Sequence, residues 1–201
     1  TYQLNGAAGP ETFRIYSRSA WLQVAGNTEA QLAASTEIVI TRNGTGAAAI
    51  VAELDNVEEI QVNTLNVTAN DGGGLNQGAA GNDTVTVSGN FTGTSLNFST
   101  ITIDGAAGDD TVDISGLTSA HRIVFRSNGG HDTIIGTLRP QDVIELAPGT
   151  TRADYTATQA NGMTTLTNGS HTITYASSGT PAFGTTPVQG GEQPGGGGAF
   201  T

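Results

Sequence analysis

One short pattern recurs along this chain and limits what the chain can fold into. A glycine-rich turn is followed by an acidic residue, a threonine and an apolar residue, as in Gly-Ala-Ala-Gly-Asp-Asp-Thr-Val. Two weaker copies lack the glycines. The first apolar residues of the six copies lie 22 to 27 residues apart, and they are Phe13, Ile38, Ile60, Val85, Val112 and Ile134. This spacing predicts rungs of a solenoid, because each rung has apolar edges that only its neighbours can cover.

The residues between the copies favour strands rather than helices. Alternating segments such as Ile101-Thr102-Ile103 have the period of a half-buried strand, and no segment longer than ten residues has helical periodicity. We therefore predict an all-β chain with a parallel β-helix, a solenoid-like stack of about six rungs, over residues 1–146. An antiparallel β-sandwich is the alternative, because short strands separated by turns fit both architectures.

The regular spacing ends after residue 146. Residues 147–180 contain three alternating segments, separated by Asn161-Gly162 and Asn168-Gly169. Asn-Gly indicates a tight hairpin, because both residues tolerate positive φ. We predict a three-stranded antiparallel meander that caps the stack. Residues 181–201 are rich in glycine and proline, which predicts a flexible tail or linker.

The charge balance excludes several functions. The formal net charge is −11, and all seven basic residues are arginines, so no basic patch for nucleic acid is expected. The chain has no cysteine, which excludes disulfides and thiol chemistry. Its most apolar stretch is too short to span a membrane. The sequence begins with Thr1 rather than Met, so we expect neighbouring domains in a longer parent chain.

An acidic residue occupies the same position in most copies. The residues two before the apolar positions are Glu11, Thr36, Glu58, Asp83, Asp110 and Asp132. Stacked strands are about 4.8 Å apart, and carboxylates at that separation repel one another. A bound cation would relieve the repulsion. Calcium suits the site best, because it accepts carboxylate and backbone carbonyl oxygens in flexible geometry.

The copies resemble the haemolysin-type (RTX) calcium repeat, Gly-Gly-x-Gly-x-Asp-x-hydrophobic-x. In that family the glycine turn supplies carbonyl oxygens and the aspartate supplies carboxylate oxygens. The residues that match are Asp83, Asp110 and Asp132, with Gly81, Gly108 and Gly130, and Asp109 is a further candidate ligand. The resemblance implies Ca²⁺ binding, secretion, and folding on calcium outside the bacterial cell. The copies differ from the family because they do not follow one another in tandem, and Ala79 and Ala106 replace a glycine.

A second resemblance concerns the surroundings of this chain. Residues 78–146 look like regions found beside haem-peroxidase domains in large secreted bacterial proteins. If so, the peroxidase domain lies outside this chain, because nothing in the sequence resembles it.

We therefore expect a noncatalytic calcium-binding structural module of a secreted or cell-surface bacterial protein, a spacer or attachment region that contacts extracellular polysaccharide. One alternative is a metal-free adhesion or scaffold solenoid, in which threonines and acids stack without an ion. That reading is supported by the threonines that follow the acid, which are Thr12, Thr84, Thr111 and Thr133. A second alternative is a β-helix polysaccharide lyase or hydrolase. Its candidate cluster is Asp109, Asp110, Asp113, Arg122 and Arg126.

Overall fold

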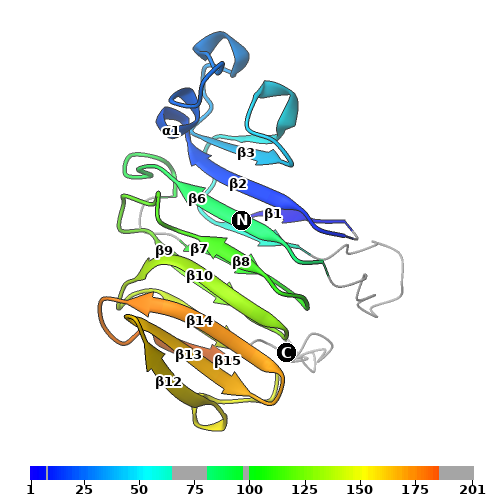
Figure 1. The fold of residues 1–201 in the computed structure, drawn as a ribbon. Coiled ribbons are helices and arrows are strands. Elements are labelled where there is room, and N and C mark those ends of the chain that lie inside the picture. Colours follow the sequence, from blue (N-terminus) through cyan, green and yellow to red (C-terminus); the bar gives the residue numbers. More distant parts are fainter. Residues whose placement is uncertain (8, 65–80, 97–99, 186–201) are drawn as a thin grey trace, which may run out of the picture.

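The computed structural model describes residues 1–7, 9–64, 81–96 and 100–185, and this part of the chain is all-β. Its strands form a six-stranded and a nine-stranded sheet (Figure 1). The six-stranded sheet contains, in spatial order, β1 (Tyr2–Asn5), β5 (Ile60–Asn63), β7 (Thr100–Asp104), β9 (Arg122–Arg126), β11 (Val143–Leu146) and β15 (Ala182–Thr185).

The nine-stranded sheet has parallel strands in its middle and antiparallel strands at both ends. Its spatial order is β12 (Thr156–Ala160), β13 (Met163–Asn168), β14 (His171–Ser177), β10 (His131–Leu138), β8 (Thr111–Asp113), β6 (Thr84–Ser88), β2 (Thr12–Ser17), β3 (Ile38–Arg42) and β4 (Ile50–Leu54). Every pair from β2 to β14 is parallel. From β5 to β11 the chain alternates between the two sheets, one strand at a time.

The inward-facing residues of both sheets form one apolar core. Side chains alternate along strands such as β6 and β7, so every second residue of these strands is buried. Phe13, Phe91 and Phe125 are among the largest fully buried side chains of this core. Each such side chain contributes about 1.5–3 kcal/mol through burial. The chain is therefore a sandwich-like arrangement of one parallel and one mixed sheet, which agrees with the sandwich alternative in its layers but not in being antiparallel throughout.

Four of the six predicted repeat positions are neighbours in the nine-stranded sheet. Phe13 pairs with Val85, Val85 with Val112, and Val112 with Ile134. The threonines one residue earlier stand in register in the same way, as expected for a stacked ladder.

The other two predicted positions do not belong to this stack. Ile38 lies in β3, which runs antiparallel to β2, and Ile60 lies in the six-stranded sheet. The prediction of one rung at each position was wrong there. Both copies lack the glycine turn, and strand alternation alone does not say in which sheet a strand lies.

The segments that connect β2 to β3 and β3 to β4 form a short excursion from the sheet, and they cover one end of the outer face of β2 and β3. Helix α1 (Arg18–Leu22) and two 3-10 helices, η1 (Glu29–Gln31) and η2 (Ala47–Ala49), belong to it. Trp21, Tyr16 and Val39 form a second, smaller buried cluster here. This excursion lies at the blue end of the structure in Figure 1, beside the last strands of the nine-stranded sheet.

The C-terminal segment forms the antiparallel meander that the sequence predicts. β12 pairs with β13 and β13 with β14, after the 3-10 helix η3 (Arg152–Asp154). The turn between β12 and β13 has φ of 53° at Asn161 and 77° at Gly162, which agrees with the Asn-Gly hairpin. The meander extends the nine-stranded sheet, because β14 pairs with β10.

Part of the predicted tail is a strand. β15 lies in residues that the sequence assigns to a flexible linker, yet it pairs in parallel with β11. Its backbone occupies the open edge of β11, so pairing depends on main-chain groups rather than on an apolar pattern. The expectation of a flexible segment was therefore wrong for residues 182–185, and residues 186–201 lie outside the described part.

Candidate functional site

Four acidic side chains form a continuous hydrogen-bonded row at the start of the parallel strands. We call Glu11, Asp83, Asp110 and Asp132 the acid ladder. The backbone N–H of Glu11 donates to Oδ1 of Asp83 at 2.6 Å. The N–H of Asp83 donates to Oδ1 of Asp110 at 2.9 Å, and the N–H of Asp110 donates to Oδ1 of Asp132 at 3.0 Å. Each of the three aspartate carboxyl groups therefore binds the main chain at the start of the neighbouring strand that precedes it in the sequence.

The acid ladder is buried. Its four side chains belong to residues that are 5% exposed or less. A buried charge is costly unless it is paired and hydrogen-bonded. The free energy of burying these acids therefore depends on the charged and hydrogen-bonding partners at the two ends of the ladder and on the protonation of its middle residue.

Basic groups stand at both ends of the acid ladder. At one end, Arg42 forms an ion pair with Glu11, whose Oε2 also accepts the N–H of Ala7 at 2.5 Å. At the other end, the Ser127 hydroxyl donates to Oδ2 of Asp132 and contacts Nε2 of His171 at 2.6 Å. The terminal carboxyl groups thus have partners that can share or balance their charge.

The C-terminal end of the ladder is joined to the meander. Nδ1 of His171 lies 2.8 Å from the Tyr155 hydroxyl, and both residues come from the segment after residue 146. A consistent assignment has Tyr155 donating to Nδ1 and Nε2–H donating to Ser127, which in turn donates to Asp132. This order of donors satisfies each group, so the chain of hydrogen bonds fastens the meander to the parallel strands.

We expect Ser127→Ala to destabilise the protein by about 1–3 kcal/mol, because it leaves Oδ2 of Asp132 and Nε2 of His171 buried without the bridging hydroxyl. Urea unfolding of the variant checks this. Ser170→Ala, in an exposed turn, is the matched control and should change the free energy of unfolding by less than about 0.5 kcal/mol. Equal effects of the two substitutions would contradict the bridge.

Asp110, in the middle of the ladder, has no basic partner among the residues that the structure describes. Its Oδ2 is buried without a hydrogen bond, in a space so small that a Cβ on Gly105 would lie 2.6 Å away. Burial and, to a smaller extent, the negative charges of Asp132, Asp83 and Asp109 together raise the pKa of Asp110 to about 8, although the hydrogen bond from the Asp83 N–H acts in the opposite direction. Asp110 therefore holds a proton at neutral pH, and this proton reduces the repulsion within the ladder.

Glycines form a second stack beside the ladder. A Cβ on Gly81 would lie less than 3.0 Å from the carbonyl oxygen of Gly9, and the same holds for Gly108 against Gly81 and for Gly130 against Gly108. The strands approach so closely at this turn that only glycine fits. Each of these carbonyl groups contacts the next glycine along the stack. The glycines that the sequence assigns to calcium are therefore required for close packing.

An exposed row runs next to the acid ladder. The N–H of Asp109 donates to Oδ1 of Asn82 at 3.0 Å, and the N–H of His131 donates to Oδ1 of Asp109 at 2.8 Å. Asp109, predicted as a further calcium ligand, uses its carboxylate in this row. A carboxylate also accepts a backbone N–H from another strand at a distant turn. There fully buried Asp142 accepts the N–H of Ile123 at 2.9 Å and forms an ion pair with Arg139.

The predicted calcium ligands lie together, but they do not form a coordination cluster. Within the described ranges, no group of three or more His, Cys, Asp or Glu side chains is placed to hold a metal ion. Oδ1 of each aspartate in the ladder already accepts a backbone N–H. Glu58, by contrast, is exposed and lies outside the ladder. The donor set thus fits a hydrogen-bonded ladder better than a calcium site.

The residues suggested for a lyase or hydrolase are separated. Asp110 lies in the buried ladder, whereas Asp113 lies on the outer face of the nine-stranded sheet. Arg122 and Arg126 belong to β9 of the other sheet. No convergent set of these acids and bases is formed.

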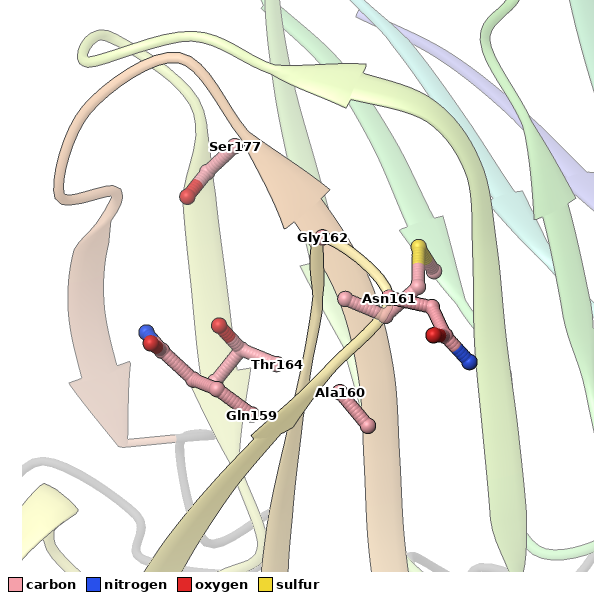
Figure 2. Close-up of a pocket in the computed structure, with 7 residues that line it drawn as sticks. Gln159, Ala160, Asn161, Gly162, Thr164 and Ser177 are labelled. Carbon is pink, nitrogen blue, oxygen red and sulfur yellow. The ribbon is translucent and has the colours of Figure 1, made fainter.

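A shallow pocket lies at the tip of the β12–β13 hairpin. It has a volume of about 340 Å³ and is shown in Figure 2 with Gln159, Asn161 and Ser177 among its lining residues. None of its seven lining residues is ionisable, so the pocket offers no acid, no base and no carboxylate or imidazole ligand for a metal.

Sequence reasoning missed Ser127, His171 and Tyr155. Ser127 and His171 are 44 residues apart, and their contact depends on how β14 pairs with β10. No local pattern in the sequence marks such a contact.

Comparison with protein-family models, with curated proteins and with solved structures finds no match for this chain. Among the residues that the structure describes, there is also no helix of the length and apolarity needed to cross a membrane. Functional reasoning therefore depends on the geometry of the chain itself.

Proposed function

We propose that this chain is a noncatalytic β-solenoid module of a secreted or cell-surface bacterial protein, where it acts as a spacer or attachment region beside other domains. The acid ladder carries the proposal, because each parallel strand satisfies the backbone of the preceding one through a buried carboxyl group. The parallel register of β2, β6, β8 and β10 supports a repeating stack. The secreted location follows from the resemblance to haemolysin-type repeats.

In this proposal the stack holds together without a metal ion. Three hydrogen bonds follow one another along the ladder. A hydrogen bond contributes about 1.5–3 kcal/mol when it is made to a charged group and about 0.5–1.5 kcal/mol when it is made to a neutral one, such as protonated Asp110. The charge of Arg42, the hydrogen bond from Ser127 to Asp132 and a proton on Asp110 stabilise the acids without a bound cation.

A calcium-binding module is the second candidate. It is favoured by Oδ2 of Asp110, a buried carboxylate oxygen with no hydrogen-bond partner between two further acids. In that case calcium would bind the carboxyl groups of the ladder only in the folded state and would stabilise it by mass action.

We expect the midpoint of thermal unfolding to be the same in EDTA and in millimolar calcium. Differential scanning calorimetry at constant ionic strength checks this. Magnesium at the same concentration is the control, because any divalent cation screens a chain with a net charge of −11. A rise in the midpoint with calcium but not with magnesium would support the calcium-binding module instead.

A further inference from the structure

The outer face of the six-stranded sheet has polar side chains in rows. In one row Gln3 pairs with Gln61 and Gln61 with Thr102, and the row then continues to the apolar Val124 and Val143. The next row, two residues further along each strand, contains Asn5, Asn63, Asp104, Arg126 and Glu145. Because neighbouring strands are about 4.8 Å apart, the second row offers a polar group at a regular interval across the sheet, and the first row does so as far as Thr102.

A groove crosses these rows. Its volume is about 280 Å³, and it extends over β5, β7, β9 and β11. The side chains that matter for binding are Gln61, Thr100, Thr102, Arg122, Arg126 and Glu145. Apart from the Val124 and Ile60 side chains, its lining is polar. A polar groove of this kind suits a ligand that is rich in hydroxyl groups.

The two arginines of the groove differ in their partners. Arg126 lies between two acids, with Nε at 2.5 Å from Oε2 of Glu145 and Nη1 at 3.6 Å from Oδ2 of Asp104. Arg122 is exposed, and its Nε and Nη2 donate to the Thr100 hydroxyl at 3.2 and 3.0 Å. In the described part of the chain, Arg122 forms no ion pair with a carboxylate, although acids outnumber bases by 18 to 7 in the sequence.

We propose that this groove binds an acidic polysaccharide, with a uronate carboxylate at Arg122 and sugar hydroxyls at Thr100, Thr102 and Gln61. This inference rests on the proposed attachment role and names its partner. A guanidinium group binds a carboxylate through two parallel hydrogen bonds. Of the two arginines in the groove, Arg122 is the one whose charge is not paired with a carboxylate of the described residues, and Glu59, just before β5, also lines the groove. The regular interval of the rows suits a polymer, because successive sugar residues present the same hydroxyls repeatedly.

Titration calorimetry with polygalacturonate tests this proposal. The experiment is done at low salt, where surface electrostatics are strongest, and in EDTA, so that calcium cannot bridge the two polyanions. The fully methyl-esterified polymer is the matched ligand, because it keeps the sugar backbone and lacks the carboxylates. We expect the native protein to bind the acid and to bind the ester at least tenfold more weakly.

Arg122→Gln should weaken binding of the acid at least tenfold, and Arg122→Lys should weaken it less, because the charge remains while the paired hydrogen bonds are lost. Arg14→Gln is the matched control. It changes the net charge equally but lies in β2 of the other sheet, so it should leave binding unchanged.

Three results would overturn the proposal: no binding by the native protein, equal binding of the ester, or equal losses in the Arg122→Gln and Arg14→Gln variants. These results are distinct from failure of the proposed function. A protein that unfolds at the same temperature in EDTA and in calcium but does not bind polygalacturonate would still be a metal-independent module.

Discussion

Gly130→Ala is expected to destabilise the protein by about 3 kcal/mol or more, which is a large fraction of the 5–15 kcal/mol of a typical domain. Two effects add up. The new Cβ would collide with the carbonyl oxygen of Gly108, and Gly130 has φ of +89°, which L residues rarely adopt. For a chain of this size the loss corresponds to a decrease of roughly 6–12 °C in the midpoint of thermal unfolding.

Two control variants separate the causes. At Gly129 a Cβ would meet nothing within 4 Å and φ is not in the left-handed region, so Gly129→Ala should be nearly neutral. Gly149 also has open space but φ of +78°, so Gly149→Ala should cost only the backbone term, about 1–2 kcal/mol. Thermal unfolding of the three variants checks the order. Similar values for Gly130→Ala and Gly149→Ala would show that the close approach of the glycine stack does not matter.

The second large effect concerns pH. The pKa of Asp110 is raised from 3.8 to about 8 in the folded protein. Below about pH 4 both the folded and the unfolded chain hold the proton. Between about pH 4 and 8 only the folded chain holds it, so the free energy of unfolding should fall as the pH rises, by at most about 1.4 kcal/mol per pH unit. Above pH 8 the contribution of Asp110 is lost.

Asp110→Asn isolates this contribution. The asparagine Oδ1 can still accept the N–H of Asp83, while the side chain can no longer ionise. Urea unfolding between pH 5 and pH 9 should therefore show a shallower decrease for the variant, which becomes more stable than the native protein at the alkaline end. Parallel curves for the two proteins would contradict the assignment.

The comparison removes the contributions of groups outside the ladder. Burial raises the pKa values of Asp83 and Asp104, which gives a trend of the same sign. Burial lowers the pKa of His121, so stability is lost as the pH falls through its ordinary value near 6.5. The contributions of Asp104 and His121 are present in the native protein and in the variant, and they cancel in the difference. The contribution of Asp83 changes together with that of Asp110, because the two groups are in contact.

The glycine turn made part of the fold predictable. Phe13, Val85, Val112 and Ile134 follow that turn and are neighbours in one sheet. The turn fixes where each strand starts, and a shared start keeps neighbouring strands in register. Ile60 follows no such turn, and its strand belongs to the other sheet. The sequence could not show this, because alternation of apolar residues indicates a strand without indicating its partners.

The acid ladder was predictable in position but not in chemistry. Counting back from the apolar residues shows that Asp83, Asp110 and Asp132 stack. It does not show that their carboxyl groups bind backbone N–H groups, because this depends on the distance between strands and on the direction of each side chain. The partners at the ends, Arg42 and His171, come from separate segments of the chain.

The hydrogen bonds of the ladder all have the same direction along the sequence. The donor always comes before the acceptor, so the order in which the chain is made matters for the stack. The N–H groups of Glu11, Asp83 and Asp110 each donate to a carboxyl group that comes later in the sequence. A growing or emerging chain that has reached Asp110 has not yet supplied the acceptor for it. The last acceptor, Asp132, is in turn held by the meander through Ser127 and His171. The row of hydrogen bonds is therefore complete only when the meander is in place beside the last parallel strand.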